Sequence, residues 1–142
     1  MSDHVTPNFA VEEFHCHSGE LYPSLWIVER LRPLCLVLER LREELGHRSI
    51  TIVSGYRSPS HNAAVGGAKQ SQHMAGRAAD ITADGVEPPA VHAALLALFR
   101  SGAIEIGGLG LYPGWVHVDV RPRPQSGHLC EWSGSRVGDE VA

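Results

Sequence analysis

Residues 71–80, Ser-Gln-His-Met-Ala-Gly-Arg-Ala-Ala-Asp, constrain the fold more than any other stretch of the chain. They place His73 and Asp80 seven residues apart, with Gly76 between them. Glycine accepts backbone conformations that let His73 turn back over a following strand. We expect that strand at residues 78–82, where Ala78 and Asp80 share one face. The fold must therefore hold a histidine and an aspartate together at the start of a strand.

A second histidine lies in the alternating stretch 115–120, Trp-Val-His-Val-Asp-Val. As a strand, it puts His117 and Asp119 on one face and three valines on the opposite, core-facing one. If strands 78–82 and 115–120 are neighbours, Asp80 and His117 face each other. Catalytic zinc takes three nitrogen or oxygen ligands and keeps one position for water. The pattern permits a zinc site at His73, Asp80 and His117, although single histidines are more often surface or hydrogen-bonded residues.

The other segments predict a small mixed fold. Apolar residues recur at helical spacing over residues 25–45, with a start or bend at Pro33 and a stop at Gly46. A second helix is expected over residues 88–100 and a helical turn over 60–65. Strands are expected at 49–54, 104–106, 108–112 and 115–120. Residues 1–24 are expected to be mostly irregular, Pro122 and Pro124 to end the regular structure, and the tail from residue 137 to be disordered.

Composition limits the class of protein. The 142 residues suffice for one domain, and the net charge of −4 gives no reason to expect nucleic acid or an anionic membrane as partner. No apolar run has the length of a membrane span. The first residues show neither the basic nor the apolar region of a secretion signal, so we expect synthesis in the cytoplasm, with the route to any cell-wall substrate left open. We expect a monomer.

The three cysteines, Cys16, Cys35 and Cys130, show no disulfide framework and no CxxC spacing, so reduced packing roles are expected. His15-Cys16-His17 resembles a metal cluster at first sight. In a strand, His15 and His17 share a face that Cys16 cannot join, and no second half-site follows at zinc-finger spacing. A loop near the mouth of a pocket is the preferred interpretation.

Taken together, His73-x-x-Gly76-x-Ala78-x-Asp80, the preceding Ser-Gly-Tyr-Arg-Ser at 54–58 and the following Val-His-Val-Asp at 116–119 resemble the zinc D-Ala-D-Ala carboxypeptidases and related murein peptidases. The short, single-domain members, common among phage and prophage lysis proteins, are the most similar. The resemblance covers roughly residues 8–132. It implies an α+β fold, with a small antiparallel sheet and helices packed on one side, as in the hedgehog signalling domain.

The same resemblance implies site residues. His73, Asp80 and His117 would bind one zinc ion, and Arg57 would contact the substrate or the transition state. The guanidinium group suits a peptide's terminal carboxylate or a developing oxyanion. Ser71 and Tyr56 are further candidates for substrate contact. Trp115 is a candidate pocket wall, and His61 and Asn62 are loop residues that could meet substrate.

One departure from the family pattern concerns the general base. Some members carry an acidic residue three positions before the last ligand, where this chain has Gly114, and several have a histidine where it has Trp115. Asp119 is therefore assigned as the base or as the residue that orients His117, and a role as ligand stays open.

Three functions follow from these observations. The first is a zinc peptidase that cleaves peptidoglycan stem peptides by metal-activated water, as a carboxypeptidase or an endopeptidase. The second is a non-catalytic, zinc-stabilised module that binds cell wall or a protein. The third is a hydrolase of another small amide. Hydrolysis by the zinc-loaded protein alone would distinguish the first from the second.

Overall fold

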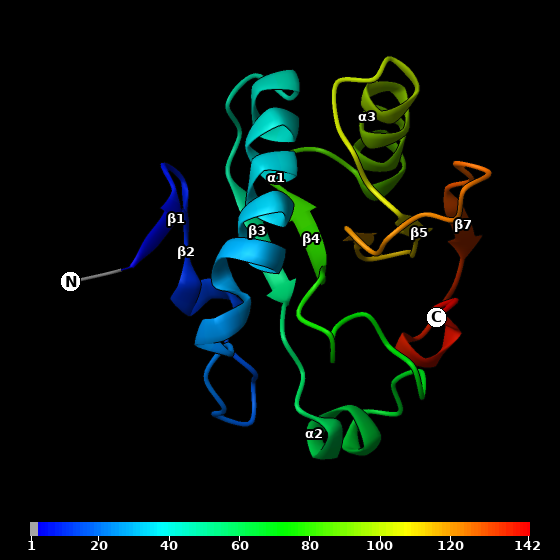
Figure 1. The fold of residues 1–142 in the computed structure, drawn as a ribbon. Helices are drawn as coiled ribbons and strands as arrows, with labels where there is room; N and C mark the ends of the chain where they lie inside the picture. The colour runs from blue at the N-terminus through cyan, green and yellow to red at the C-terminus, as the bar shows by residue number, and fades with distance from the viewer. Residues whose placement is uncertain (1–2) are drawn as a thin grey trace.

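The computed structural model describes residues 3–142 and is built around a five-stranded sheet of order β3-β4-β6-β5-β7 (Figure 1). The strands are β3 (Ile50–Ser54), β4 (Ala78–Ala83), β5 (Gly108–Leu111), β6 (Val116–Asp119) and β7 (Cys130–Ser133). Neighbouring strands are antiparallel except β5 and β7, which are parallel. A separate hairpin of β1 (His4–Thr6) and β2 (Phe9–Ala10) precedes the sheet. The expected α+β class is confirmed.

Two long helices, α1 (Arg32–Glu44) and α3 (Pro88–Arg100), cover one face of the sheet (Figure 1). Their buried side chains, such as Leu38 and Leu95, join a single core with the apolar face of the sheet. The short α2 (Pro59–Ala64) lies away from this core, beyond the end of β3. Single turns of helix occur at η1 (Val11–Phe14), η2 (Ser24–Trp26), η3 (Ile27–Leu31) and η4 (Val137–Asp139). Among residues 3–142, no helix is long and apolar enough to cross a membrane.

Alternation along β4 and β6 divides the sheet into two faces. Ala79 pairs with Val118 and Ile81 with Val116, and all four side chains are buried in the core beneath the helices. The intervening residues therefore point to the opposite face. There, Asp80 lies directly across from His117, as the sequence pattern predicts.

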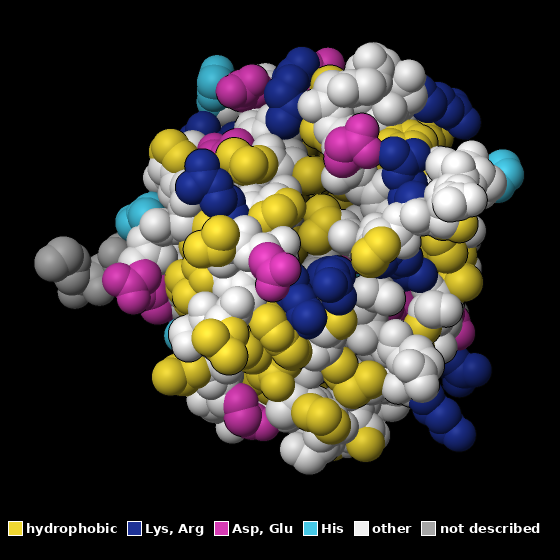
Figure 2. Space-filling model, viewed as in Figure 1, with side chains coloured by type: hydrophobic (Ala, Val, Ile, Leu, Met, Phe, Trp, Pro, Cys, Tyr) yellow, Lys and Arg dark blue, Asp and Glu magenta, His cyan; other side chains and the backbone are white. Residues whose placement is uncertain are grey.

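The predicted helix over residues 25–45 is only partly confirmed. Regular α-helix begins at Arg32, and the residues before it form η2 and the π-helical turn η3. Pro33 has no N–H to donate to residue 29, so the hydrogen-bond register changes just before it. Leu25 in η2 and Val28 in η3 are 89% and 77% exposed instead of core-facing. The same region of the surface carries several apolar side chains (Figure 2).

Three other segments differ from expectation. Residues 104–106 form no strand, although Ile104 and Ile106 are buried. Regular structure continues beyond Pro124, because β7 adds to the free edge of β5 and makes the sheet mixed rather than purely antiparallel. The tail is ordered where we expected disorder, with η4 followed by the buried Glu140. The Ser71 hydroxyl and the backbone N–H of Gln72 each donate a hydrogen bond to the Glu140 carboxylate and hold it in place.

Candidate metal centre

The two histidines and Asp80 meet on the face of the sheet that the helices leave uncovered. Oδ1 of Asp80 lies 3.2 Å from Nε2 of His73 and 3.4 Å from Nδ1 of His117. All three residues are at most 5% exposed. Ligand atoms held at tetrahedral angles by zinc, with bonds of 2.0 to 2.1 Å, are about 3.3 to 3.4 Å apart. Both distances from Asp80 Oδ1 to the histidine nitrogens therefore match the separation of two ligands on one zinc ion.

The loop before β4 presents His73 to Asp80. Gly76 adopts φ of 69°, a left-handed conformation that lets the chain reverse between the two residues. A side chain there would also collide with Tyr22 and Trp26, whose rings pack against this turn. The backbone N–H of Arg57 donates to the carbonyl oxygen of His73 over 3.2 Å, which joins the loop to the segment after β3. The turn predicted from Gly76 is confirmed.

Each histidine uses its other ring nitrogen to fix its orientation. Nδ1 of His73 lies 2.7 Å from the carbonyl oxygen of Gly55, and Nε2 of His117 lies 2.7 Å from Oδ2 of Asp119. Oxygen is the acceptor in both pairs, so these nitrogens carry the protons. The nitrogens that face Asp80 can then offer lone pairs to a metal. This arrangement of outward hydrogen bonds is typical of histidine ligands.

Asp119 lies on the side of His117 that faces away from Asp80. Its side chain is fully buried, and both of its oxygens accept from Arg121, with Nη2 to Oδ2 at 2.7 Å and Nε to Oδ1 at 2.9 Å. Burial opposes the charge, but the hydrogen bonds from His117 and Arg121 lower the pKa of Asp119 to about 2. This geometry favours an orienting role over that of a base.

Glycines in β5 make room for this arrangement. Gly108 pairs with Asp119, and a Cβ on it would lie 2.2 Å from the Asp119 carboxylate. Gly110 pairs with His117, and a Cβ there would meet the Trp132 ring at 2.5 Å. That ring packs on His117 with its centroid 4.8 Å away. The alternation Gly-Leu-Gly thus keeps the face beside His117 open for Asp119, Arg121 and Trp132.

Charges in the cluster are strongly coupled in the metal-free protein. Burial by itself would raise the pKa of Asp80, but His73 and His117 together hold it well below its usual range. Burial by itself would lower the pKa of His117, yet the hydrogen bonds to Asp119 and Asp80 raise it to about 9. A cation is therefore favoured at this position, either a proton on His117 or a metal ion.

Arg57 contacts the same cluster. Its buried guanidinium donates to Oδ2 of Asp80 at 3.4 Å and to the side-chain oxygen of Asn62 at 3.1 Å. Asn62, expected to be a loop residue, lies in α2 instead, where it is buried and holds Arg57. Arg57 and Asp80 line a cavity of about 220 Å³, with His17, His61 and Trp115 among the other wall residues. His17 therefore lies at a pocket, as expected for the 15–17 loop.

Other predicted site residues lie elsewhere. The side chain of Tyr56 packs edge-on against Tyr22 and Trp26, outside the wall of this cavity. Ser71 is buried and donates to Glu140 over 2.7 Å, so in this structure it contacts the tail. His15 accepts a hydrogen bond from the backbone of Tyr22 through Nδ1. The open alternative of a metal shared by His15 and His17 gains no support from that contact.

Glu140 is the residue that sequence reasoning missed. The donor atoms of His73, His117 and Glu140 lie within 4.8 Å of one another, so Glu140 stands beside the two histidines as a further side chain able to hold a metal ion. Glu140 comes from the end of the chain, which lies beside the loop before β4 (Figure 1). A glutamate in a short polar tail carries no sequence signal for such a position.

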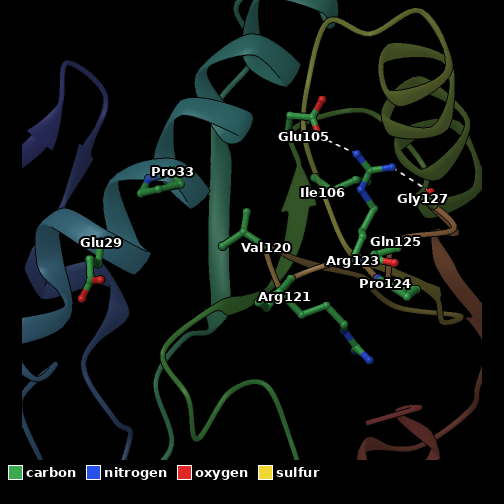
Figure 3. A pocket seen from close by; sticks show the side chains of 11 residues that line it. Glu29, Pro33, Glu105, Ile106, Val120, Arg121, Arg123, Pro124, Gln125 and Gly127 are labelled. Carbon is green, nitrogen blue, oxygen red and sulfur yellow. Dashed lines mark hydrogen bonds and ion pairs between the residues drawn. The ribbon is translucent and has the colours of Figure 1, made fainter.

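A larger cavity lies apart from this cluster. It measures about 540 Å³ and is bounded by α1 and residues 120–127, with Glu105 and Arg123 on its wall (Figure 3). None of His73, Asp80 and His117 lines it. The Arg123 guanidinium donates hydrogen bonds to the Glu105 carboxylate and to the carbonyl oxygen of Gly127. We therefore place the candidate site at the smaller cavity, whose wall includes the predicted ligand Asp80 and its partner Arg57.

Comparison with known proteins identifies the family of this chain. The chain is 40% identical over 77 residues to the zinc D-Ala-D-Ala carboxypeptidase of Streptomyces albus G, a match that covers 54% of this chain and 29% of that protein. The chain thus spans less than a third of that relative's length. The model of the family described as peptidase M15 matches residues 7–119, which include all three predicted ligands. The chain therefore belongs to the peptidase M15 family.

Proposed function

We propose that this protein is a zinc peptidase that hydrolyses peptidoglycan stem peptides. The position of Asp80 between His73 and His117 carries the proposal, because its Oδ1 is separated from a nitrogen of each ring as zinc ligands are. Membership of the peptidase M15 family and the similarity to a zinc D-Ala-D-Ala carboxypeptidase support the choice of metal and of substrate class. When bound, zinc supplies Lewis acidity for the scissile carbonyl and for water.

The residues of the chain itself have distinct tasks in this proposal. His73, Asp80 and His117 hold the metal, and Gly55 and Asp119 fix the two imidazole rings. The Arg57 guanidinium supplies a fixed positive charge on the cavity wall. That charge suits the terminal carboxylate of a stem peptide or the oxyanion that develops during amide hydrolysis.

Hydrolysis of a synthetic stem pentapeptide ending in D-Ala-D-Ala tests the proposal. Zinc-loaded protein should cleave it, and protein treated with chelator should not until zinc is restored. Mass analysis of the products separates release of terminal D-Ala, which defines a carboxypeptidase, from an internal cut. A His73→Ala variant serves as the control for contaminating peptidases. Stoichiometric zinc binding without cleavage of this peptide or of intact murein would refute the enzyme and favour the zinc-stabilised binding module.

A further inference from the structure

Glu140 occupies a built position beside the two histidines. Its Oε1 accepts from the Ser71 hydroxyl at 2.7 Å, and its Oε2 accepts from the backbone N–H of Gln72 at 2.8 Å. The Ser71 hydroxyl oxygen also accepts from the backbone N–H of His73 at 3.1 Å. One serine thus ties both His73 and the Glu140 carboxylate to the same loop. These contacts fix the carboxylate with respect to the metal ligands.

The surroundings of Glu140 suit a functional carboxylate better than a structural one. The residue is 7% exposed, and no Lys or Arg within residues 3–142 forms an ion pair with it. Arg57 and Arg121 interact with it only through longer-range electrostatics. Burying a carboxylate without a direct ion pair is costly, so a position of this kind is usually retained for chemistry. Each oxygen accepts one of the two hydrogen bonds described above, and a carboxylate has about four acceptor sites. Capacity to accept a further proton or hydrogen bond is left.

The other carboxylates of the site are already committed. Oδ1 of Asp80 lies between the two histidines, and its Oδ2 accepts from Arg57. Both oxygens of Asp119 are bonded to Arg121, on the far side of His117. At the position three residues before His117, where some family members carry an acidic residue, this chain has Gly114. The Glu140 carboxylate has a donor atom within 4.8 Å of those of His73 and His117, and within residues 3–142 its side-chain hydrogen bonds come from the 71–72 loop.

We propose that Glu140, brought in by the C-terminal tail, is the general base of the site; this proposal rests on the proposed peptidase function. The carboxylate accepts one proton from the attacking water as the water oxygen bonds to the peptide carbonyl carbon. The same proton then passes to the amide nitrogen as the C–N bond breaks, and the amine leaves. The second proton of the water departs with the new carboxyl group, and the Glu140 carboxylate is regenerated.

The test compares Glu140→Gln with wild type in protein loaded with zinc or cobalt. The glutamine oxygen can accept from the backbone N–H of Gln72, and its NH2 group can donate to the Ser71 hydroxyl oxygen, so the fold and the melting temperature should be preserved. Metal content and the visible absorption of the cobalt form should be unchanged, while turnover of the stem pentapeptide falls about 100-fold or more. Glu131→Gln makes the same exchange at an exposed residue of β7 and should match wild type. Glu140→Asp retains a carboxylate and should recover part of the lost rate.

Binding of acetohydroxamic acid gives a second result that needs no peptide substrate. This compound binds a metal centre as an anion, and a neighbouring base stabilises it by accepting the released proton. We expect Glu140→Gln to weaken its binding to the cobalt protein roughly tenfold or more, the loss of one charge-assisted hydrogen bond. If wild type binds it and fails to cleave the peptide, the proposed substrate is wrong while the hydroxamate comparison still decides the role of Glu140.

Three outcomes would overturn the role as base. Faster hydrolysis or tighter hydroxamate binding by Glu140→Gln would mean that the tail blocks the site. Loss of metal or an altered cobalt spectrum would make Glu140 a ligand. Wild-type turnover and wild-type hydroxamate binding would make it a bystander.

Discussion

Asp119 accepts a hydrogen bond from Nε2 of His117 at 2.7 Å, and this contact decides which nitrogen of the ring faces Asp80. Arg121 holds the carboxylate from the opposite side at 2.7 Å. Asp119, the middle residue of this hydrogen-bonded series, is 0% exposed. The carboxylate therefore orients the imidazole and has no access to a molecule in the cavity.

Replacing Asp119 with Asn tests this orienting role. The exchange keeps the size of the side chain but removes the charge that fixes the His117 proton on Nε2. We expect zinc affinity to fall about 10- to 100-fold, with a smaller loss of turnover once zinc is saturating. Competition with a chelating dye measures the affinity, and Asp84→Asn, at an exposed turn, is the control. Full zinc occupancy with a collapsed turnover would instead identify Asp119 as the base.

The ligand set can be separated from its neighbours by metal content. His73→Ala, Asp80→Ala and His117→Ala should each reduce bound zinc sharply, because three protein ligands cannot become two without a large loss of affinity. Glu140→Ala should retain zinc, because we assign that carboxylate to proton transfer. Mass spectrometry of dialysed protein gives the occupancy. Retention of zinc by Asp80→Ala, together with its loss in Glu140→Ala, would transfer the third ligand position to the tail.

The pairing of Asp80 with His117 could be predicted because strand alternation is a local property. Residues 78–82 and 115–120 each show which side chains share a face, and a single assumption of adjacency brings the two together. The same applies to α3, whose predicted bounds agree with Pro88–Arg100. The turn at Gly76 could be predicted in the same way, because glycine readily adopts the left-handed conformation found there.

The role of the tail could not be predicted because it depends on contacts between distant residues. Glu140 is 69 residues from Ser71 in sequence, and its burial follows from that single long-range hydrogen bond and the one to Gln72. The strand β7 is similarly defined by its parallel pairing with β5. Predicting the π-helical turn η3 would require knowing how the chain approaches α1 before Pro33. None of these features has a periodicity that a short window of sequence displays.

Arg57 is expected to serve both metal and substrate. Arg57→Ala removes the donor to Oδ2 of Asp80, so zinc affinity should fall about tenfold, the loss of one hydrogen bond to a charged group. Turnover at saturating zinc should fall by on the order of 100-fold, as for loss of a transition-state contact. Arg57→Lys keeps the charge without the planar fork and should recover only part of the rate. If Arg57→Ala keeps wild-type turnover at saturating zinc, Arg57 only supports Asp80.

The melting temperature of the metal-free protein should fall as the pH rises through neutrality. Folding raises the pKa of His117 from 6.5 to about 9, so its contribution to stability is full below pH 6.5 and is lost as the pH passes 9. The lowered pKa values of Asp80 and Asp119 contribute a constant amount over this range, because both residues stay ionised. We expect chelator-treated protein to melt at least about 5 °C lower at pH 9.5 than at pH 6.5.

Zinc should reverse this trend. The metal requires a neutral imidazole, so its binding displaces the His117 proton and strengthens as the pH rises. The gap in melting temperature between zinc-loaded and chelator-treated protein should therefore widen from pH 6.5 to pH 9.5. His128→Gln alters an exposed histidine and should leave both curves unchanged. A metal-free protein whose melting temperature stays level or rises over this range would contradict the charged state of His117, and with it the coupling of proton and metal at this site.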